Sequence, residues 1–407
     1  MRKRALDAGG SQTRIAKSAM DKTCIPSPCM EIPVDAAVKG HIIKDRLTDF
    51  VIKKSPCASL NGRRFVRGDA MNQYSGNMLI CNNEDVKVLQ EITYINLLYA
   101  IASDCYNRGI NDDDFQVIVC IPAAEFYDDR NDRIDEVKTN LAGTTSIYFP
   151  MLDTSVRFTI DRLNIGVVAE GVVAAYKYKN DRNFVFKNTI IFDVGYRSTD
   201  VTVLLKFEPV GEGAASRPVG GINLEANIQS KMERDNLFVS TKVIQEALST
   251  IYVIDKDATE LTDITDYIHR AKEEGVKDYI GRALDLMRTD GIMVSRAQIE
   301  QAVRSHYILH GSEIVDITDY VHEAKIVFAD LLHRIALDVT NAKMMNIGDI
   351  SNTLCVGRPF SGDLDDPYNL VNLLRDKFHG DVCMYAVPDA GTANVVEMIQ
   401  LLGSDSE

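Results

Sequence analysis

Two short turns in this sequence place a glycine two residues after an aspartate. They read DAGGSQTR at residues 7–14 and DVGYRSTD at residues 193–200. Glycine lets the backbone approach a phosphate closely, and successive N–H groups in a tight turn can bind an anion. Asp7 and Asp193 are themselves negative, so we expect them to hold Mg²⁺ through water or to orient an attacking water molecule. The pattern favours a site for phosphate and a divalent cation.

The first turn carries further groups suited to phosphate. Arg14 follows Asp7 by seven residues and has the charge to offset a phosphate. Ser11, Gln12 and Thr13 add hydrogen-bond donors. Either turn alone is a weak signal, because an Asp–Gly pair is commonly just a hairpin tip. Two such turns at equivalent places in the chain make a much stronger one.

Strand patterns flank both turns and predict where the turns lie. Residues 3–8 and 13–19 are expected to form a hairpin around the first turn, and 188–193 and 200–206 flank the second. The apolar run QVIVCIP at 116–122 has the composition of a buried strand. We therefore predict an α/β fold with two duplicated α/β domains that face each other across a cleft holding both turns.

The rest of the chain predicts the elements that complete this fold. Residues 20–84 are broken by prolines and read as a small irregular insert, followed by a helix from Asn83 to Gly109. Beyond residue 210 the periodicity predicts mainly helices. The expected strands are 156–160, 163–168, 353–356 and 382–387, and the expected helices are 222–236, 240–249, 265–288, 295–307, 317–345, 367–378 and 391–402.

A local repeat stands out among the predicted helices. DITDYIHRAK at 263–272 and DITDYVHEAK at 316–325 are identical at eight of ten positions. We interpret both as helix starts with one capping arrangement, in which Asp or Thr is at the cap and Asp266 and Asp319 lie in the first turn. The alternative is a pair of contact surfaces.

The composition indicates which kinds of binding partner and which cellular compartment to expect. The 45 Lys and Arg residues against 59 Asp and Glu give a net charge of −14, which disfavours direct binding to DNA or RNA. No segment has the roughly 18–20 apolar residues of a membrane span, and no signal peptide or lipidation motif is evident. Eight scattered cysteines without a CxxC pair indicate reduced thiols. We expect a soluble cytoplasmic protein without a membrane partner.

These motifs together resemble those of the actin-like ATPases, and most closely those of ParM-type plasmid-segregation proteins. DAGGSQTR and DVGYRSTDVTVL resemble their two phosphate motifs, and LCVGRPFSG resembles their adenosine motif. QVIVCIPAAEFYDDR, LNIGVVAEGVVAAYKY and RPVGGINLEANI resemble the segments between these motifs. The resemblance covers about residues 3–402 and implies an actin-like fold. It implies one domain at 1–187, with a variable insert at 20–84 and a C-terminal helix at about 388–403 that returns to it, and a second at 188–387, with a helical insert at about 240–310.

The resemblance also implies roles for individual residues. Asp7 and Asp193 would hold hydrated Mg²⁺ and assist catalysis, and Glu170 would orient or deprotonate the water that attacks the γ-phosphate. The remaining nucleotide-binding positions that it implies are Gly9, Gly10, Ser11, Gln12, Thr13, Arg14, Gly195, Arg197, Ser198, Thr199, Gly220, Gly221, Asn223, Gly357, Arg358 and Pro359.

Some positions depart from the family pattern. Arg14 replaces a lysine, and Tyr196 and Arg197 stand where ParM-like sequences have glycine and threonine. VGRPFSG lacks the usual Gly–Gly pair, which leaves Arg358 to stack on a base. These departures leave the choice between ATP and GTP open.

The resemblance implies an ATPase that assembles head to tail into filaments and segregates plasmid DNA through a ParR-type adaptor. A small-molecule kinase of the same fold is the main alternative, because sugar kinases open with a turn similar to DAGGSQT. A further alternative is a chaperone-like or cell-division relative of actin. No sugar-binding motif is evident, and neither an additional substrate-binding domain nor a terminal membrane helix is expected, so filament formation is favoured.

Overall fold

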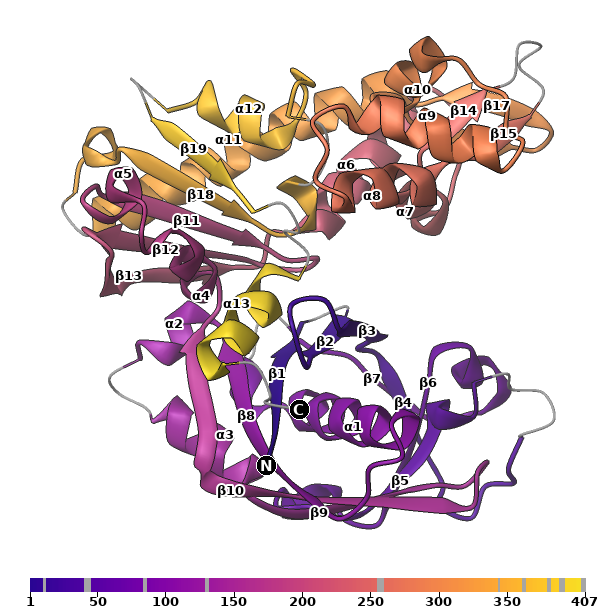
Figure 1. The fold of residues 1–407 in the computed structure, drawn as a ribbon, viewed down its shortest axis with the longest axis vertical. Helices are drawn as coiled ribbons and strands as arrows, with labels where there is room; N and C mark the ends of the chain where they lie inside the picture. Colours follow the sequence, from indigo (N-terminus) through magenta and orange to yellow (C-terminus); the bar gives the residue numbers. More distant parts are fainter. Residues whose placement is uncertain are drawn as a thin grey trace. The chain divides into compact units, whose positions relative to one another are not determined.

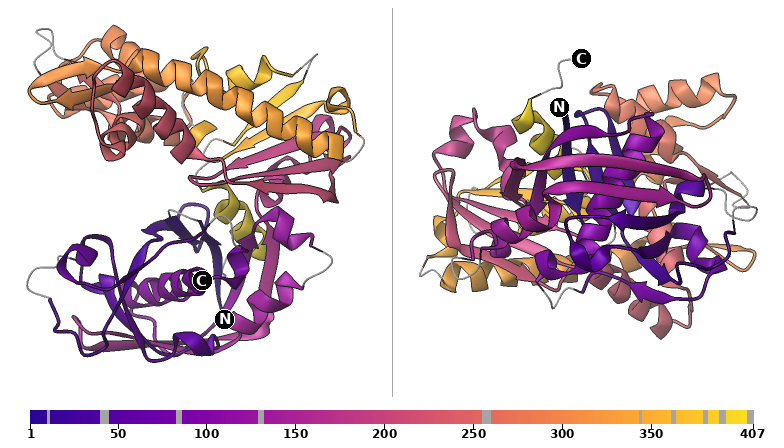
Figure 2. Two further views of the ribbon diagram at one scale, coloured as in Figure 1. Left: turned by 180° about the vertical axis from the view of Figure 1, so that it is seen from behind. Right: turned by 90° about the horizontal axis from the view of Figure 1, so that it is seen from below.

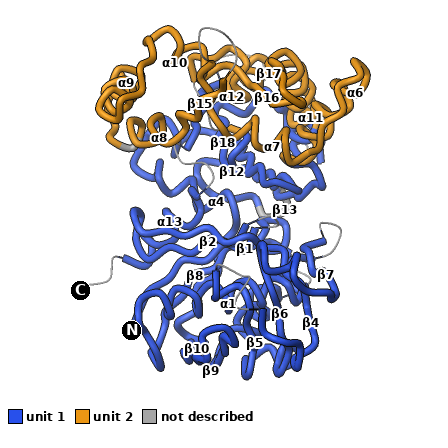
Figure 3. Tube along the Cα trace, turned by 90° about the vertical axis from the view of Figure 1, so that its right-hand side faces the viewer, with its two compact units in different colours: residues 1–220, 335–359, 380–407 blue, residues 221–334, 360–379 orange. Residues whose placement is uncertain are grey.

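The structure is a computed structural model, and it describes residues 1–9, 12–39, 45–82, 86–128, 132–254, 260–342, 345–360, 364–378, 382–387 and 392–403. Gly10, Ser11 and Asn83, which carry expectations above, lie outside these residues. The chain divides into two compact units, shown in two colours in Figure 3. The first unit comprises 1–220, 335–359 and 380–407, and the second comprises 221–334 and 360–379. Both Asp–Gly turns belong to the first unit.

A mixed sheet forms much of the first unit (Figure 1). Its described strands are β1 (Arg2–Ala8), β2 (Gln12–Ala16), β3 (Lys22–Pro26), β4 (Cys29–Ile32), β5 (Asp49–Lys54), β6 (Arg63–Arg67), β7 (Asn77–Leu79), β8 (Asp113–Ile121), β9 (Gly143–Phe149) and β10 (Thr154–Ala169). They follow the order β3-β2-β1-β8-β10-β9-β5-β6-β4-β7. β1 pairs antiparallel with β2 and parallel with β8, which in turn pairs parallel with β10.

A second sheet in the same unit repeats the arrangement around β1. Its described strands are β11 (Thr189–Val194), β12 (Thr199–Leu205), β13 (Glu208–Arg217), β18 (Asn352–Val356) and β19 (Cys383–Ala386). Their order is β13-β12-β11-β18-β19, in which β11 pairs antiparallel with β12 and parallel with β18. This matches β3-β2-β1-β8-β10 in order and strand direction, so the predicted duplication is present in the backbone.

Helices cover both faces of the strands that carry the first turn. The larger sheet curves around α1 (Glu91–Asn107), which is apolar on almost every side (Figures 1 and 2). Tyr99 of this helix packs on Phe50 of β5, with ring centroids 4.6 Å apart. On the other face, α13 (Ala393–Leu402) packs Val395, Met398 and Ile399 against β1, β2 and β8. Burial on both faces fixes the position of β1.

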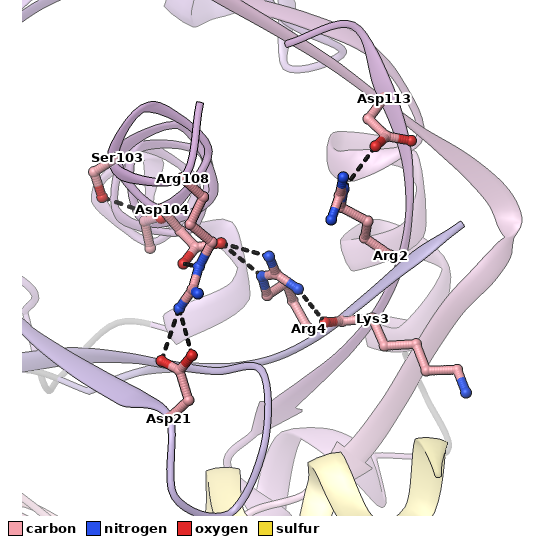
Figure 4. A network of polar contacts seen from close by, with 9 residues as sticks. Arg2, Lys3, Arg4, Asp21, Ser103, Asp104, Arg108 and Asp113 are labelled. Atoms are coloured by element: carbon pink, nitrogen blue, oxygen red, sulfur yellow. Dashed lines mark hydrogen bonds and ion pairs between the residues drawn. The ribbon is translucent and has the colours of Figure 1, made fainter. Parts of the chain in front are cut away.

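An ionic network also ties β1 to α1 (Figure 4). Arg4 is fully buried and forms an ion pair of 2.6 Å with Asp104. Asp104 also accepts a hydrogen bond of 2.6 Å from Arg108, which reaches Asp21 beyond β2. A buried guanidinium needs such a partner, because its desolvation is otherwise uncompensated.

The remaining helices of the first unit are short or connect the two sheets. They are α2 (Ala123–Phe126), α3 (Arg133–Leu141), α4 (Val172–Ala175), α5 (Arg182–Val185) and the end of α11 (Thr318–Ala342). None of the helices in the described ranges is both long and apolar enough to cross a membrane.

The second unit is mainly helical and contains the repeat. Its helices are α6 (Gly221–Arg234), α7 (Thr241–Ser249), α8 (Thr265–Glu273), α9 (Tyr279–Thr289), α10 (Arg296–Ala302), the first part of α11, and α12 (Leu370–Arg375). Two hairpins, β14 (Tyr252–Ile254) with β15 (Leu261–Asp263) and β16 (Tyr307–His310) with β17 (Glu313–Asp316), lie between them.

The DITDY repeat proves to be part of a longer duplicated unit. Each copy runs helix–hairpin–helix, as α7-β14-β15-α8 and α10-β16-β17-α11. Asp263 and Asp316 accept the N–H of the threonine two residues later, at 2.9 Å in both copies. The first helix of each copy packs on the hairpin of the other. Both copies start a helix with an aspartate in the first turn, as predicted, but the N-cap of α8 is Ile264 and not Asp or Thr. The sequence analysis missed both hairpins.

Several boundaries differ from the predicted ones for identifiable reasons. The strands expected at 156–160 and 163–168 form one strand, β10, whose pairing shifts register between Ile160 and Ile165. The helix expected at 265–288 is two helices separated at Gly275, which has φ +67°. The helix expected from Asn83 begins at Glu91, after a turn of 3₁₀-helix at Lys87–Leu89.

Candidate functional site

The two Asp–Gly turns have equivalent positions in the two sheets. Asp7 and Asp193 are each the second-last residue of the central strand, β1 or β11. Across the hairpin, Asp7 pairs with Arg14, and Asp193 pairs with Asp200 at the same seven-residue offset. The duplicated backbone thus carries a cation in one turn and a second carboxylate in the other.

Side chains behind the first turn hold it in place. Arg14 Nη1 donates a hydrogen bond of 2.9 Å to Asp7 Oδ2. Thr13 is fully buried, and its hydroxyl lies 3.0 Å from that of Ser27, which donates to the Gly9 carbonyl at 2.6 Å. Thr13 and Ser27 therefore fix the backbone of the turn from its buried side.

The second turn is braced in a different way. The Gly195 N–H bonds to the Ser198 carbonyl at 2.8 Å, and Thr199 Oγ1 donates to the Val219 carbonyl at 2.6 Å. Arg197, one of the departures from the family pattern, donates from Nη1 to the Cys81 carbonyl at 2.9 Å. This arginine joins the second turn to the segment that leads into α1.

Glu170 precedes a glycine that lies against Asp193. It follows the end of β10, and its N–H bonds to the Ile121 carbonyl at 2.8 Å. The next residue, Gly171, has φ +70°, and a Cβ there would be 3.1 Å from the Cβ of Asp193. Asn394 of α13 fastens the arrangement, because it donates to Asp193 Oδ2 at 2.9 Å and accepts the Gly171 N–H at 3.3 Å.

A lysine that the sequence analysis did not single out completes the cluster. Lys87 forms an ion pair with Glu170, and both side chains are only about one-tenth exposed, at 12% and 11%. The negative charge of Asp7 also helps to keep Lys87 protonated, because it raises the pKa of the lysine. No motif surrounds this lysine in the sequence, so only the folded chain brings it to the site.

Burial and mutual repulsion shape the protonation of the carboxyl groups. Burial raises the pKa of Glu170, and although Lys87 opposes this, Asp7 and the carboxylates of the second turn add to it. Burial likewise raises the pKa of Asp193, and burial together with Asp193 raises the pKa of Asp200 to about 7. Burial favours deprotonation of Lys87, but Glu170 and Asp7 outweigh it and raise the lysine pKa. Lys87 therefore stays charged inside an acidic cluster.

The donor set of this cluster fits a hard divalent cation. One ligand atom each from Asp7, Cys120 and Glu170 lies within 4.8 Å of the other two. Burial, Asp7 and Glu170 raise the pKa of Cys120, which keeps it a thiol and leaves oxygen as the donor. Among the described residues, no hydrogen-bond donor reaches the buried Oδ1 of Asp200. Carboxylate oxygens with unused acceptor capacity suit Mg²⁺.

The residues expected near a nucleoside are divided between the two compact units. Gly357 follows β18 with φ +108°, and a Cβ there would lie 2.1 Å from the Val194 carbonyl, so only glycine fits beside β11. Arg358 and Pro359 follow in a turn of 3₁₀-helix. Gly220 ends a stretch of the first unit, whereas Gly221 and Asn223 lie in α6 of the second unit.

Solved structures match this backbone over almost its whole length. An archaeal actin homologue in complex with ADP has a TM-score of 0.62 at 15% identity, over 99% of both chains. Bacillus thuringiensis ParM with AMPPNP has a TM-score of 0.61 at 12% identity, over 98% of this chain and 97% of that one. The chain has the actin-like fold. The apo pSK41 ParM protein matches with a TM-score of 0.57 at 12% identity, over 98% of this chain and 96% of that one. No family model and no curated protein matches the sequence.

The actin-like fold confirms the resemblance to ParM-type proteins at the level of the backbone. Within it, the structure brings Asp7, Arg14, Glu170 and Asp193 into one cluster. Sequence reasoning did not assign Lys87, Cys120, Asp200 and Asn394 to the site. Of these, only Asp200 had a visible signal, the same seven-residue offset that separates Asp7 from Arg14.

Proposed function

We propose that this chain binds and hydrolyses ATP, or GTP, together with Mg²⁺, and that nucleotide controls its assembly into a head-to-tail filament. The observation that carries the proposal is the cluster of Asp7, Glu170 and Asp193, which combines carboxylates from equivalent turns of two duplicated sheets. Such a cluster suits phosphoryl transfer, in which positioning and charge neutralisation do most of the work.

The proposed roles follow the chemistry of each group. Asp7 and Asp193 would hold hydrated Mg²⁺, which would neutralise phosphate charge when bound. Glu170 orients the attacking water or accepts its proton, since its carboxylate is largely buried and interacts electrostatically with Asp7 and Asp193. The proposed nucleotide contacts are Gly9, Gly10, Ser11, Gln12, Thr13 and Arg14 in the first turn, Gly195, Arg197, Ser198 and Thr199 in the second, and Gly220, Gly221, Asn223, Gly357, Arg358 and Pro359 around ribose and base.

The two sheets support a division of the chain into actin-like domains. We assign residues 1–187, with the insert at 20–84, to one domain and 188–387, with the helical insert at about 240–310, to the other. The helix at about 388–403 then returns to the first, as the packing of α13 on β1 and β8 supports. Loss of the γ-phosphate would remove contacts to both turns, and that difference provides a way to couple hydrolysis to disassembly.

The cellular role that we propose is plasmid segregation through an adaptor of the ParR type. The matching structures include several ParM proteins, one of them described as a non-polymerisable mutant of pCBH ParM. The net charge of −14 supports indirect rather than direct engagement of DNA. A heterologous head-to-tail contact generates an open helical filament when its rotation does not close a ring.

Light scattering of the purified protein with Mg-ATP, with Mg-ADP and without nucleotide tests the proposal, with phosphate release followed in parallel. We expect scattering to rise with ATP and to decay as phosphate appears, and electron microscopy to show filaments at the plateau. Nucleotide binding without any polymer at micromolar protein would contradict the filament, and a screen of sugar and small-acid acceptors would then test for a kinase.

A further inference from the structure

The backbone around Lys87, which opens the short 3₁₀-helix before α1, is held by side chains of two helices. Its backbone N–H donates to Glu125 Oε1 at 2.6 Å, and the N–H of the next residue, Val88, donates to the other oxygen at 3.1 Å. Thr93 Oγ1 donates to the Lys87 carbonyl at 2.8 Å, and the Tyr94 hydroxyl donates to the Val88 carbonyl at 2.6 Å. Four hydrogen bonds from α1 and α2 therefore fix where the lysine side chain starts.

The side chain that starts from this fixed point ends among carboxylates. Its ammonium group pairs with Glu170 and interacts with Asp7, and it also acts on Asp193 and Asp200 of the second turn. An ammonium has three donors on a flexible stem, whereas an arginine in a fixed pair is harder to redirect. Lys87 is thus a cation in the site that can change partner without moving the backbone.

The charge of the site supports such a change of partner. Three further acidic side chains, those of Asp7, Asp193 and Asp200, act electrostatically on Glu170 there. Among the described residues, the cations with the largest effect on Asp193 are Arg14, which is already bonded to Asp7, and Lys87. A triphosphate would add negative charge to this excess, and Mg²⁺ would offset only part of it. A γ-phosphate would then compete with Glu170 for the ammonium group.

We propose that Lys87 is a γ-phosphate-binding residue that pairs with Glu170 when no triphosphate is present and transfers to the γ-phosphate when one binds. This inference rests on the function proposed above. It adds a nucleotide-binding residue and a way to distinguish triphosphate from diphosphate. The exchange releases the Glu170 carboxylate to orient water only when a γ-phosphate is present. The site would therefore distinguish a nucleoside triphosphate from a diphosphate through Lys87.

The test compares the affinities of Mg-AMPPNP and Mg-ADP, measured by titration calorimetry on the full chain. We expect Lys87→Met to weaken AMPPNP binding about 10- to 100-fold, the usual range for a lost charged hydrogen bond, and ADP binding by less than about 3-fold. The matched control is Lys54→Met, which removes an exposed lysine of β5. An unchanged ratio of the two affinities would overturn the inference and leave the proposed function standing.

A second pair of variants covers the case in which Lys87→Met does not fold, since it leaves Glu170 buried without a cation. Lys87→Gln combined with Glu170→Gln removes both charges, and it is compared with Glu170→Gln alone. We expect the double variant to lose the preference for AMPPNP that the single variant keeps. Equal preferences in the two variants would refute the role of Lys87, and wild-type protein that binds neither nucleotide would refute the proposed function and this inference together.

Discussion

Glu170→Gln is the substitution that examines the proposed chemistry most directly. Glutamine keeps the size and shape of the side chain. It cannot act as a general base, and it has no negative charge to polarise a bound water. A positioned general base or water-orienting group typically contributes about 10²- to 10⁴-fold to a rate. We therefore expect phosphate release from ATP to fall by about that factor while nucleotide binding and assembly persist. Filaments of the variant should be longer-lived than those of the wild type.

The same substitution has a stability cost that the structure allows us to bound. Breaking a buried ion pair on one side typically costs about 3–5 kcal/mol, because the remaining charge stays desolvated. Glu170 and Lys87 are both largely buried, but the carboxylate of Asp7 remains near the ammonium group after the change. We therefore expect the free energy of unfolding to fall by about 1–3 kcal/mol, below the full range.

The assay follows phosphate release and scattering in the same reaction at saturating Mg-ATP, and urea unfolding measures stability separately. The control is Glu31→Gln, which weakens an ion pair with Arg63 in the same sheet. Arg63 donates two hydrogen bonds of 2.8 Å to Glu31, and both residues lie outside the acidic cluster. It should leave phosphate release unchanged. Wild-type hydrolysis in Glu170→Gln filaments would show that Glu170 neither orients nor activates the attacking water.

Three further predictions concern the scaffold. Asp104→Asn leaves the buried guanidinium of Arg4 without its counter-ion, so the free energy of unfolding, measured in urea, should fall by about 2–4 kcal/mol. Arg108→Met loses a more exposed ion pair and should lower it by at most about 1 kcal/mol. Gly357→Ala puts a methyl group against a carbonyl of β11 at a positive φ, so nucleotide affinity should fall at least 10-fold by calorimetry; unchanged affinity would place the nucleoside elsewhere. Burial, aided by a nearby lysine, lowers the pKa of His306 to about 4, so the unfolded state binds a proton that the folded state does not between about pH 4 and 6.5. Stability should therefore decrease as pH falls through that window by about 1–3 kcal/mol, and thermal unfolding of His306→Gln should show a flatter pH dependence than wild type.

The sequence by itself determined the central strands and the turns that they carry. The runs around Asp7 and Asp193 have strand patterns and each is followed by a glycine, so local patterning was enough to place both. The duplication was visible because the two turns share an Asp-x-Gly pattern. Arg14 followed from its short distance to Asp7 along the chain, which a hairpin converts into direct pairing. Glu170 followed only from the resemblance to a family.

Sequence reasoning was weaker wherever long-range pairing decides the local structure. β10 continues through 160–165 because the neighbouring strands hold it on both sides of a register shift, although the sequence itself suggests a break. The two hairpins of the second unit form where helices predominate, because each is packed against the first helix of the other repeat copy. Neither effect leaves a signal within a window of ten residues.

Only the tertiary structure decided the electrostatics of the site. Lys87 lies 83 residues from Glu170 along the chain, and Asn394 lies 201 residues from Asp193, so no spacing rule connects them. Each pair meets because one element starts where a strand ends: Lys87 opens η4 (Lys87–Leu89) near the end of β10, and Asn394 lies in the first turn of α13 near the end of β11. A residue's type and spacing thus identified the groups able to bind phosphate. Burial and the convergence of distant segments determined which charges act on them.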